Sequence, residues 1–242
     1  MSSHNKSQYA EKDNSYYDLF REEILDLIPS STKHLLDVGC GMGTISSMAK
    51  KKFNIDEVIG IEKFENAASV ASTKLDKVIC GDIETLQLEY KNNYFDCILC
   101  ADIFEHLINP ENVIRKLHNL LSDNGVMITS LPNIRHIVPL LKIIFDRLEH
   151  EESGVLDKTH LHFYTLHTMK KMFAETGFEI QKIETNRSIS LKFRLVNMIT
   201  LGLFKPFTIY QYIFVLKKKR EALNDGGQFL VDEKHWGKQT LD

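Results

Sequence analysis

Short apolar runs alternate with amphipathic stretches along most of this chain, and their order predicts an architecture. The runs have the length of buried strands, and the stretches between them repeat apolar side chains every three or four positions, as helices do. The predicted strands are 35–38, 58–61, 78–80, 94–100, 126–131, 178–183 and 209–216. The predicted helices are 15–28, 44–52, 65–74 and 110–121, with another that ends before Gly177. This alternation indicates an α/β fold, a doubly wound sheet with helices on both faces.

Three glycines at alternate positions follow the first predicted strand. The stretch Leu35–Gly43 reads as a buried strand, a tight turn and a helix start, with Asp37 two positions before Gly39. Glycine permits positive φ and lets a ligand approach the backbone closely, and the start of a helix offers N–H groups without intrahelical partners. We therefore expect a nucleotide-like ligand here. The spacing G-x-G-x-G differs from the G-x-G-x-x-G of dinucleotide folds, which weakens an NAD-dependent alternative.

Acidic residues lie at or just after the ends of the next predicted strands. Glu62 closes the second strand, where a carboxylate can accept hydrogen bonds from both ribose hydroxyls. Its charge argues against a ribose that carries a 2′-phosphate. Asp82 follows the third strand, and Asp102 and His106 follow the fourth. Open α/β sheets bind ligands at the carboxyl ends of their strands, so we expect these side chains at one site.

The stretch Asp37–Gly43, taken with these acids, resembles the nucleotide-binding loop of class I S-adenosylmethionine-dependent methyltransferases. The resemblance covers 35–131 closely and 165–217 loosely. It implies a Rossmann-like sheet of seven strands with the last strand antiparallel, and S-adenosyl-L-methionine as cofactor. It places Asp82 and Ile83 at the adenine, and Ala101 and Asp102 at the methionine part. The cofactor-binding residues expected are Asp37, Gly39, Cys40, Gly41, Glu62, Lys63, Gly81, Asp82, Ile83, Ala101 and Asp102.

Two segments outside the sheet pattern are candidates for the acceptor site. A leading helix often covers the cofactor in the resembled family, so Tyr17 at its start is either a lid residue or a packing residue. The stretch 132–165 looks like an insertion seen in small-molecule methyltransferases of sugar and surface-polysaccharide pathways, where it contributes to the acceptor pocket. The acceptor-binding residues expected are Tyr17, Asn133, His136 and Asp157. We expect one domain over 1–217 and a mobile tail at 218–242.

A hydroxyl acceptor must lose a proton, and histidine, with a reference pKa of about 6.5, suits that role. His106 follows the fourth strand, and His160 lies in the insertion near Asp157, which could orient its ring. An extended 159–164 would place His160 and His162 on one face. We expect His160 and His106 as catalytic bases. Asp157, His160 and His162 also permit a metal site, but no flanking motif supports one and no metal is expected.

Composition narrows the class of protein. The chain has 242 residues and is 43% hydrophobic, enough for one core, and its net charge of -3 gives no electrostatic reason to expect nucleic acid. No apolar window reaches the roughly 18 residues of a membrane span, and the polar opening predicts no signal peptide. The four cysteines, Cys40, Cys80, Cys97 and Cys100, fall in or beside predicted strands, and Cys97 and Cys100 are expected as buried thiols in a cytoplasmic protein. In a strand, Cys97 and Cys100 point to opposite faces.

The apolar segment 191–206 carries several cations and has more than one interpretation. A packing helix is favoured, and a shield over the pocket, a homodimer contact and a helix resting on a membrane surface are the alternatives.

The resemblance predicts a methyltransferase that acts on a hydroxyl of a small polar acceptor, a sugar or a sugar-linked intermediate, by in-line displacement with a histidine base. N-methylation of an amino sugar or another small metabolite is the near alternative. A non-catalytic protein that binds the cofactor and regulates a partner is the alternative of another class.

Overall fold

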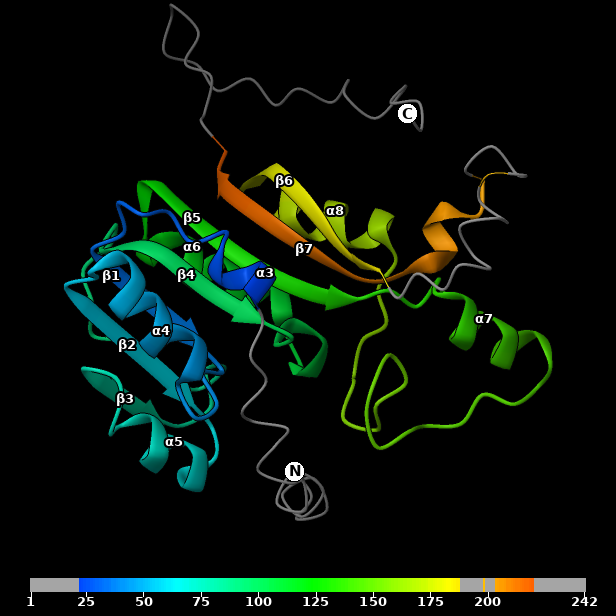
Figure 1. Ribbon diagram of the computed structural model, residues 1–242, viewed down its shortest axis with the longest axis horizontal. Coiled ribbons are helices and arrows are strands. Elements are labelled where there is room, and N and C mark those ends of the chain that lie inside the picture. Colours follow the sequence, from blue (N-terminus) through cyan, green and yellow to red (C-terminus); the bar gives the residue numbers. More distant parts are fainter. Residues whose placement is uncertain (1–21, 188–197, 199–202, 220–242) are drawn as a thin grey trace, which may run out of the picture.

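A single mixed sheet forms the centre of the molecule in a computed structural model of the chain, which describes residues 22–187, 198 and 203–219 (Figure 1). Within these residues seven strands pair in the order β3-β2-β1-β4-β5-β7-β6. All neighbours from β3 to β5 are parallel, and β7 is antiparallel to both β5 and β6. The strands are β1 (His34–Val38), β2 (Glu57–Glu62), β3 (Lys77–Cys80), β4 (Phe95–Ala101), β5 (Leu121–Pro132), β6 (Phe178–Arg187) and β7 (Ile209–Lys218). The predicted doubly wound, Rossmann-like sheet with an antiparallel last strand is confirmed.

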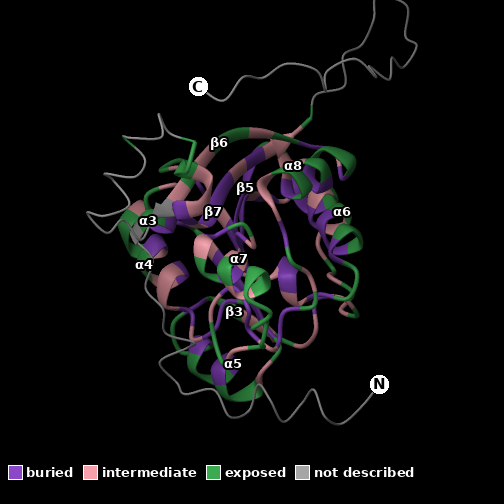
Figure 2. Ribbon diagram, turned by 90° about the vertical axis from the view of Figure 1, so that its right-hand side faces the viewer, coloured by how far each residue is buried: buried purple, intermediate pink, exposed green. Residues whose placement is uncertain are grey.

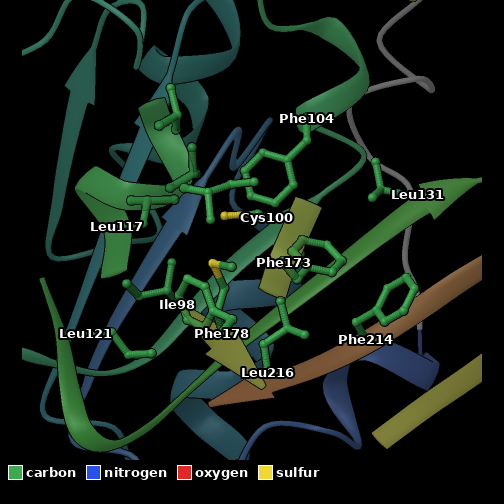
Figure 3. Close-up of a cluster of buried hydrophobic side chains, with 14 of the residues drawn as sticks. Ile98, Cys100, Phe104, Leu117, Leu121, Leu131, Phe173, Phe178, Phe214 and Leu216 are labelled. Atoms are coloured by element: carbon green, nitrogen blue, oxygen red, sulfur yellow. The ribbon is translucent and has the colours of Figure 1, made fainter. Parts of the chain in front are cut away.

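Helices cover both faces of this sheet. The α-helices are α3 (Glu22–Leu25), α4 (Thr44–Phe53), α5 (Glu65–Ala71), α6 (Pro110–Leu120), α7 (Ile137–Ile144) and α8 (Leu166–Glu175), and the 3-10 helices are η1 (Phe104–His106) and η2 (Lys205–Thr208). One buried cluster joins α3, α4 and α5 to one face of the sheet. A larger cluster joins α6 and α8 to the other face, with Phe104, Phe173 and Phe214 fully buried (Figure 3). Parallel strands with both faces covered are apolar throughout, as the sequence pattern predicted.

Alternation along the strands divides side chains between these two clusters. Leu35 and Cys97 belong to the cluster under α4, whereas Leu36 and Cys100 belong to the cluster under α6. Cys97 and Cys100 therefore point to opposite faces, as expected. Cys97 and Cys100 are buried, as expected, whereas Cys80 on the edge strand β3 is exposed.

Several predicted element ends are wrong by a few residues. The helix predicted over 65–74 ends at Ala71, because the hydroxyls of Ser72 and Thr73 donate to carbonyls three residues back. The helix predicted to Ile28 ends at Leu25, where turns lead to Pro29. The helix predicted to Leu121 ends at Leu120, and β5 begins at once at Leu121.

The insertion contains a short helix, α7, and an irregular loop. The helix α7 ends at Ile144, and Ile144 and Phe145 are 63% and 65% exposed. Most residues of α7 are exposed or intermediate (Figure 2). The stretch 159–164 is not a strand, so the condition under which His160 and His162 would share one strand face is not met. Most of 191–206 and the tail beyond 219 lie outside the described residues. No helix among the described residues is long and apolar enough to cross a membrane.

Candidate active site

The glycine loop joins β1 to α4 through three left-handed glycines. Gly39, Gly41 and Gly43 have φ of 73°, 54° and 73°, values that side chains with a Cβ rarely adopt. The N–H groups of Gly39 and Cys40 donate to the carbonyl of Ile61 at 2.8 and 3.1 Å, which ties the loop to β2. A Cβ on Gly39 would lie 2.0 Å from Cδ1 of Ile103. The loop is therefore shaped by both conformation and close packing.

Glu62 at the end of β2 supports this loop from beneath. Its carboxylate accepts hydrogen bonds from the N–H groups of Gly41 and Phe64, each at 2.9 Å, and the residue is 5% exposed. Burial raises the pKa of Glu62, while these backbone donors oppose the shift. A carboxylate offers about four lone-pair directions, more than these two contacts use, so Glu62 can also accept from a hydroxyl group of a ligand.

Asp37 lies deeper, as the next-to-last residue of β1. Its carboxylate accepts a 2.5 Å hydrogen bond from Oγ of Ser46 on α4. Burial raises the pKa of Asp37 to about 6, an effect that the Ser46 hydrogen bond opposes and the charge of Glu62 reinforces. A cationic ligand in the adjoining cavity would favour the ionised form.

Asp82 follows β3 and is half-buried at the far side of the same cavity. Its carboxylate makes an ion pair with Lys63 at 2.8 Å and accepts a 3.0 Å hydrogen bond from the N–H of Glu84. Burial acts to raise the pKa of Asp82, but the Lys63 contact and the backbone donor hold it below its usual value. Asp82 therefore presents a charged acceptor, and Lys63 is held beside it.

One cavity gathers all eleven residues that were expected to bind the cofactor. It opens at the carboxyl ends of β1, β2, β3 and β4, and its walls contain Asp37, Gly39, Cys40, Gly41, Glu62, Lys63, Gly81, Asp82, Ile83, Ala101 and Asp102. His106 also lines it. The walls contain further residues that sequence reasoning missed, including Phe64 and Ile103. Phe64 lies two residues after Glu62, and Ile103 lies directly after Asp102. Their positions next to strand-end acids could have identified them as candidates.

The insertion brings the ring of His160 against the ring of His106, the last residue of η1. The N–H groups of Leu161 and His162 donate to the carbonyl of Glu105 at 2.8 and 3.2 Å, so the loop is anchored on η1. The ring centroids of His106 and His160 are 4.7 Å apart. Two histidines separated by more than fifty positions in the sequence therefore form one pair.

Backbone carbonyls orient both rings. Nδ1 of His106 lies 3.2 Å from the carbonyl of Thr159, and Nδ1 of His160 lies 3.1 Å from the carbonyl of Val155. A carbonyl only accepts, so Nδ1 donates in each of these contacts, and in the neutral ring Nε2 then carries the lone pair. Nδ1 of His160 is thus oriented by Val155 rather than by Asp157. The pKa of His106 falls to about 4, through burial first and then through the neighbouring His160.

A carboxylate completes this group. Glu105 is 1% exposed, and one of its oxygens lies within 4.8 Å of a ring nitrogen of His106 and of His160. Two imidazoles and a carboxylate are ligands that divalent transition metals accept. The set differs from the alternative considered on sequence grounds, because Asp157 and His162 are not part of it. Glu105 was missed, although an acid inside an apolar strand-end segment was a usable signal.

Three of the four predicted acceptor residues, all within the described part of the chain, do not line the cavity. Asn133 is buried, and its amide donates to the carbonyls of Pro206 and Ile209 at 3.1 and 2.9 Å. Asp157 accepts hydrogen bonds from the N–H and hydroxyl of Thr159 at 2.8 and 2.7 Å. His136 caps α7 and packs edge-on against Tyr210. Tyr17 lies outside the described residues.

Comparisons with known proteins agree with this fold. A family model described as a methyltransferase domain matches residues 9–183. A ubiquinone biosynthesis O-methyltransferase of Rickettsia canadensis is 28% identical over 160 residues, which are 64% of this chain and 66% of the relative. One of the same name from Coxiella burnetii is 32% identical over 107 residues, 42% of this chain and 44% of the relative. The chain thus matches less than two thirds of the length of these curated relatives.

Solved structures share the fold across most of the chain. An S-adenosylmethionine-dependent methyltransferase from Archaeoglobus fulgidus has a TM-score of 0.62 at 20% identity, covering 85% of this chain and 97% of that one. One from Mesorhizobium loti has a TM-score of 0.60 at 15% identity, covering 81% and 96%. At these identities the likeness establishes the architecture.

Proposed function

We propose that this chain, which belongs to the family of methyltransferase domains, is a class I methyltransferase that uses S-adenosylmethionine and transfers its methyl group to a hydroxyl oxygen of a small acceptor. The observation that carries the proposal is the convergence of the eleven expected cofactor residues on one cavity that also contains His106. In this proposal Glu62 accepts hydrogen bonds from the ribose hydroxyls, and Asp82 accepts one from the adenine amino group.

Methyl transfer from a sulfonium is an in-line displacement, so alignment is the main task of the protein. Holding the reactants in attack geometry can supply roughly 7–11 kcal/mol of barrier reduction. When bound, the cofactor supplies the activated methyl carbon. The chain itself binds and orients the two reactants, and takes up the hydroxyl proton at an Nε2 of the His106–His160 pair. The pKa of His106, near 4, keeps its ring neutral at neutral pH, and the same shift makes it a weaker base than an ordinary imidazole.

The acceptor belongs to this proposal as well. A small polar acceptor, a sugar or sugar-linked hydroxyl, was the expectation from resemblance, and no relative named above carries a sugar in its name. The two curated relatives are named as O-methyltransferases of ubiquinone biosynthesis, which supports oxygen as the methylated atom. We therefore place hydroxyls of quinone-type intermediates beside sugar hydroxyls as acceptor classes.

The test measures S-adenosylhomocysteine formation from S-adenosylmethionine with a panel of nucleotide sugars, amino sugars and phenolic hydroxyl compounds. We expect turnover with at least one hydroxyl acceptor, and a loss of about 10² to 10⁴-fold in kcat for His160→Ala or His106→Ala, because a positioned base contributes that much. Methylation of amino sugars alone would favour N-methylation. Binding of the cofactor without turnover across the panel would favour the regulatory alternative.

One observation favours a second mechanism at the same place. The donor atoms of Glu105, His106 and His160 lie within 4.8 Å of one another, and a divalent cation there could bind the acceptor oxygen and lower its pKa. If the histidines act alone, a chelator leaves activity intact. If activity falls on chelation and returns with added Zn²⁺ or Mn²⁺, the cation mechanism replaces the histidine base.

A further inference from the structure

Asp102, the first residue after β4, has an unusual backbone conformation. Its φ is +54°, in the left-handed region, and it is followed by η1 with the His106 side chain. Among residues with a side chain, Asp and Asn tolerate this region best, and such a conformation persists only where the surroundings hold it. The structure shows what holds Asp102.

Two buried polar residues on neighbouring strands fix it. The Asp102 N–H donates to the carbonyl and hydroxyl oxygens of Ser130 at 3.3 and 3.1 Å, and the Ser130 hydroxyl donates to Oδ1 of Asp102 at 2.7 Å. Nε2 of Gln211 donates to the same Oδ1. Because a carboxylate only accepts, the orientation of the Gln211 amide is determined. Ser130 is 0% and Gln211 5% exposed.

The position of this network within the cavity points to one part of the cofactor. Along the strand order β3-β2-β1-β4, Asp82 stands at one end of the cavity and Asp102 at the other, with Glu62 and the glycine loop between them. With adenine at Asp82 and ribose at Glu62, the amino-acid end of the cofactor reaches Asp102. That end carries an α-ammonium group, and a carboxylate is its natural charge-assisted partner.

We propose that Ser130 and Gln211 are positioning residues, which hold the Asp102 carboxylate in place to bind the α-ammonium group of the methionine portion. The inference rests on the proposed function, because it requires the cofactor in this cavity. It assigns a role to β7: this antiparallel strand places Gln211 beneath the binding site from a part of the sequence that carries no cofactor motif.

The experiment compares two ligands that differ in that amino-acid portion. S-adenosylhomocysteine contains it, and 5′-methylthioadenosine lacks it, while both carry adenine and ribose. Calorimetric titration is carried out on the wild type, Gln211→Met, Ser130→Ala and Asp102→Asn. Met fills the space of Gln211 without a donor, and Asn keeps the left-handed preference of Asp102 without its charge.

We expect each variant to bind S-adenosylhomocysteine roughly 10-fold more weakly, as the loss of a hydrogen bond to a charged group implies. Affinity for 5′-methylthioadenosine should stay within about twofold of the wild type, and Ser130→Thr, which keeps the hydroxyl, should restore affinity for S-adenosylhomocysteine. Gln181→Met on β6 is the matched control, since the Gln181 amide is exposed and donates to Glu179 at 2.8 Å.

Each contrary result has a separate meaning. Equal weakening of both ligands would overturn the inference, because it indicates a general structural role for the network. Unchanged binding of S-adenosylhomocysteine in Gln211→Met and Asp102→Asn would also overturn it. Absence of binding of either ligand to the wild type would instead contradict the proposed function itself.

Discussion

Glu62 offers the sharpest perturbation of the cofactor site, because one carboxylate serves both the loop and the ligand. Its two oxygens accept from the N–H groups of Gly41 and Phe64, each at 2.9 Å. Glu62→Ala removes both acceptors, and Glu62→Gln leaves one oxygen and turns an NH₂ group toward the other N–H. We expect the order wild type, Gln variant, Ala variant in both stability and cofactor affinity.

The magnitude follows from these contacts. A hydrogen bond to a charged group contributes about 1.5–3 kcal/mol, but Glu62 is buried and its desolvation offsets part of that gain. We therefore expect the free energy of unfolding to fall by about 1–3 kcal/mol in Glu62→Ala. Lost hydrogen bonds to the ribose hydroxyls should weaken S-adenosylhomocysteine by a similar ~1–3 kcal/mol, which is roughly 5- to 140-fold in Kd.

The assay pairs urea denaturation with calorimetric titration of S-adenosylhomocysteine. Glu57→Ala is the matched control, because Glu57 begins the same strand, accepts a 2.6 Å hydrogen bond from the Tyr94 hydroxyl and does not line the cavity. A folded Glu62→Ala protein whose affinity stays within twofold of the wild type, as expected for Glu57→Ala, would refute the ribose role.

Three further predictions concern the glycine loop, the buried acid of β1 and the histidine pair. Gly39→Ala should lower the free energy of unfolding by about 2–4 kcal/mol, because alanine is strained at positive φ and its Cβ would overlap Ile103. Urea denaturation measures this loss, and unchanged stability would contradict the prediction. Burial raises the pKa of Asp37 from 3.8 to about 6, so the folded state holds its proton more tightly and ligand-free stability should fall as pH rises from 4 to 6. Asp37→Asn should abolish that loss of stability, which amounts to about 3 kcal/mol. Identical pH profiles of stability in the wild type and the variant would disprove the shift. Thr159→Val, which removes a hydroxyl 3.2 Å from Nδ1 of His106, should lower kcat severalfold with KM for the cofactor unchanged; a change confined to KM would argue against a role in orienting the base.

The parts of the fold and site that sequence reasoning located are those with local signals. Strands buried on both faces read as apolar runs, and Glu62 stands where a strand ends, so their neighbours in the chain suffice to place them. The glycine loop is equally local, because positive φ at Gly39 and Gly41 is a conformation that glycine adopts most readily.

Contacts between residues that lie far apart in the sequence could not be predicted from such local signals. The His106–His160 pair forms because the insertion loop anchors on the carbonyl of Glu105, and nothing in the pattern around His160 specifies that contact. The same holds for Gln211, whose partner Asp102 lies on another strand. The ends of elements were predicted wrongly for a related reason, since β5 extends back to Leu121 to pair with Phe95, five residues before the predicted strand begins at Val126.

The central claim is that the cavity at the carboxyl ends of the strands binds S-adenosylmethionine. Calorimetric titration of the wild type with S-adenosylhomocysteine, with NADH as the control ligand, tests it most directly. The account predicts micromolar binding of S-adenosylhomocysteine at one site per chain and no measurable binding of NADH. Tighter binding of NADH than of S-adenosylhomocysteine would contradict it and return the glycine loop to the dinucleotide-binding class.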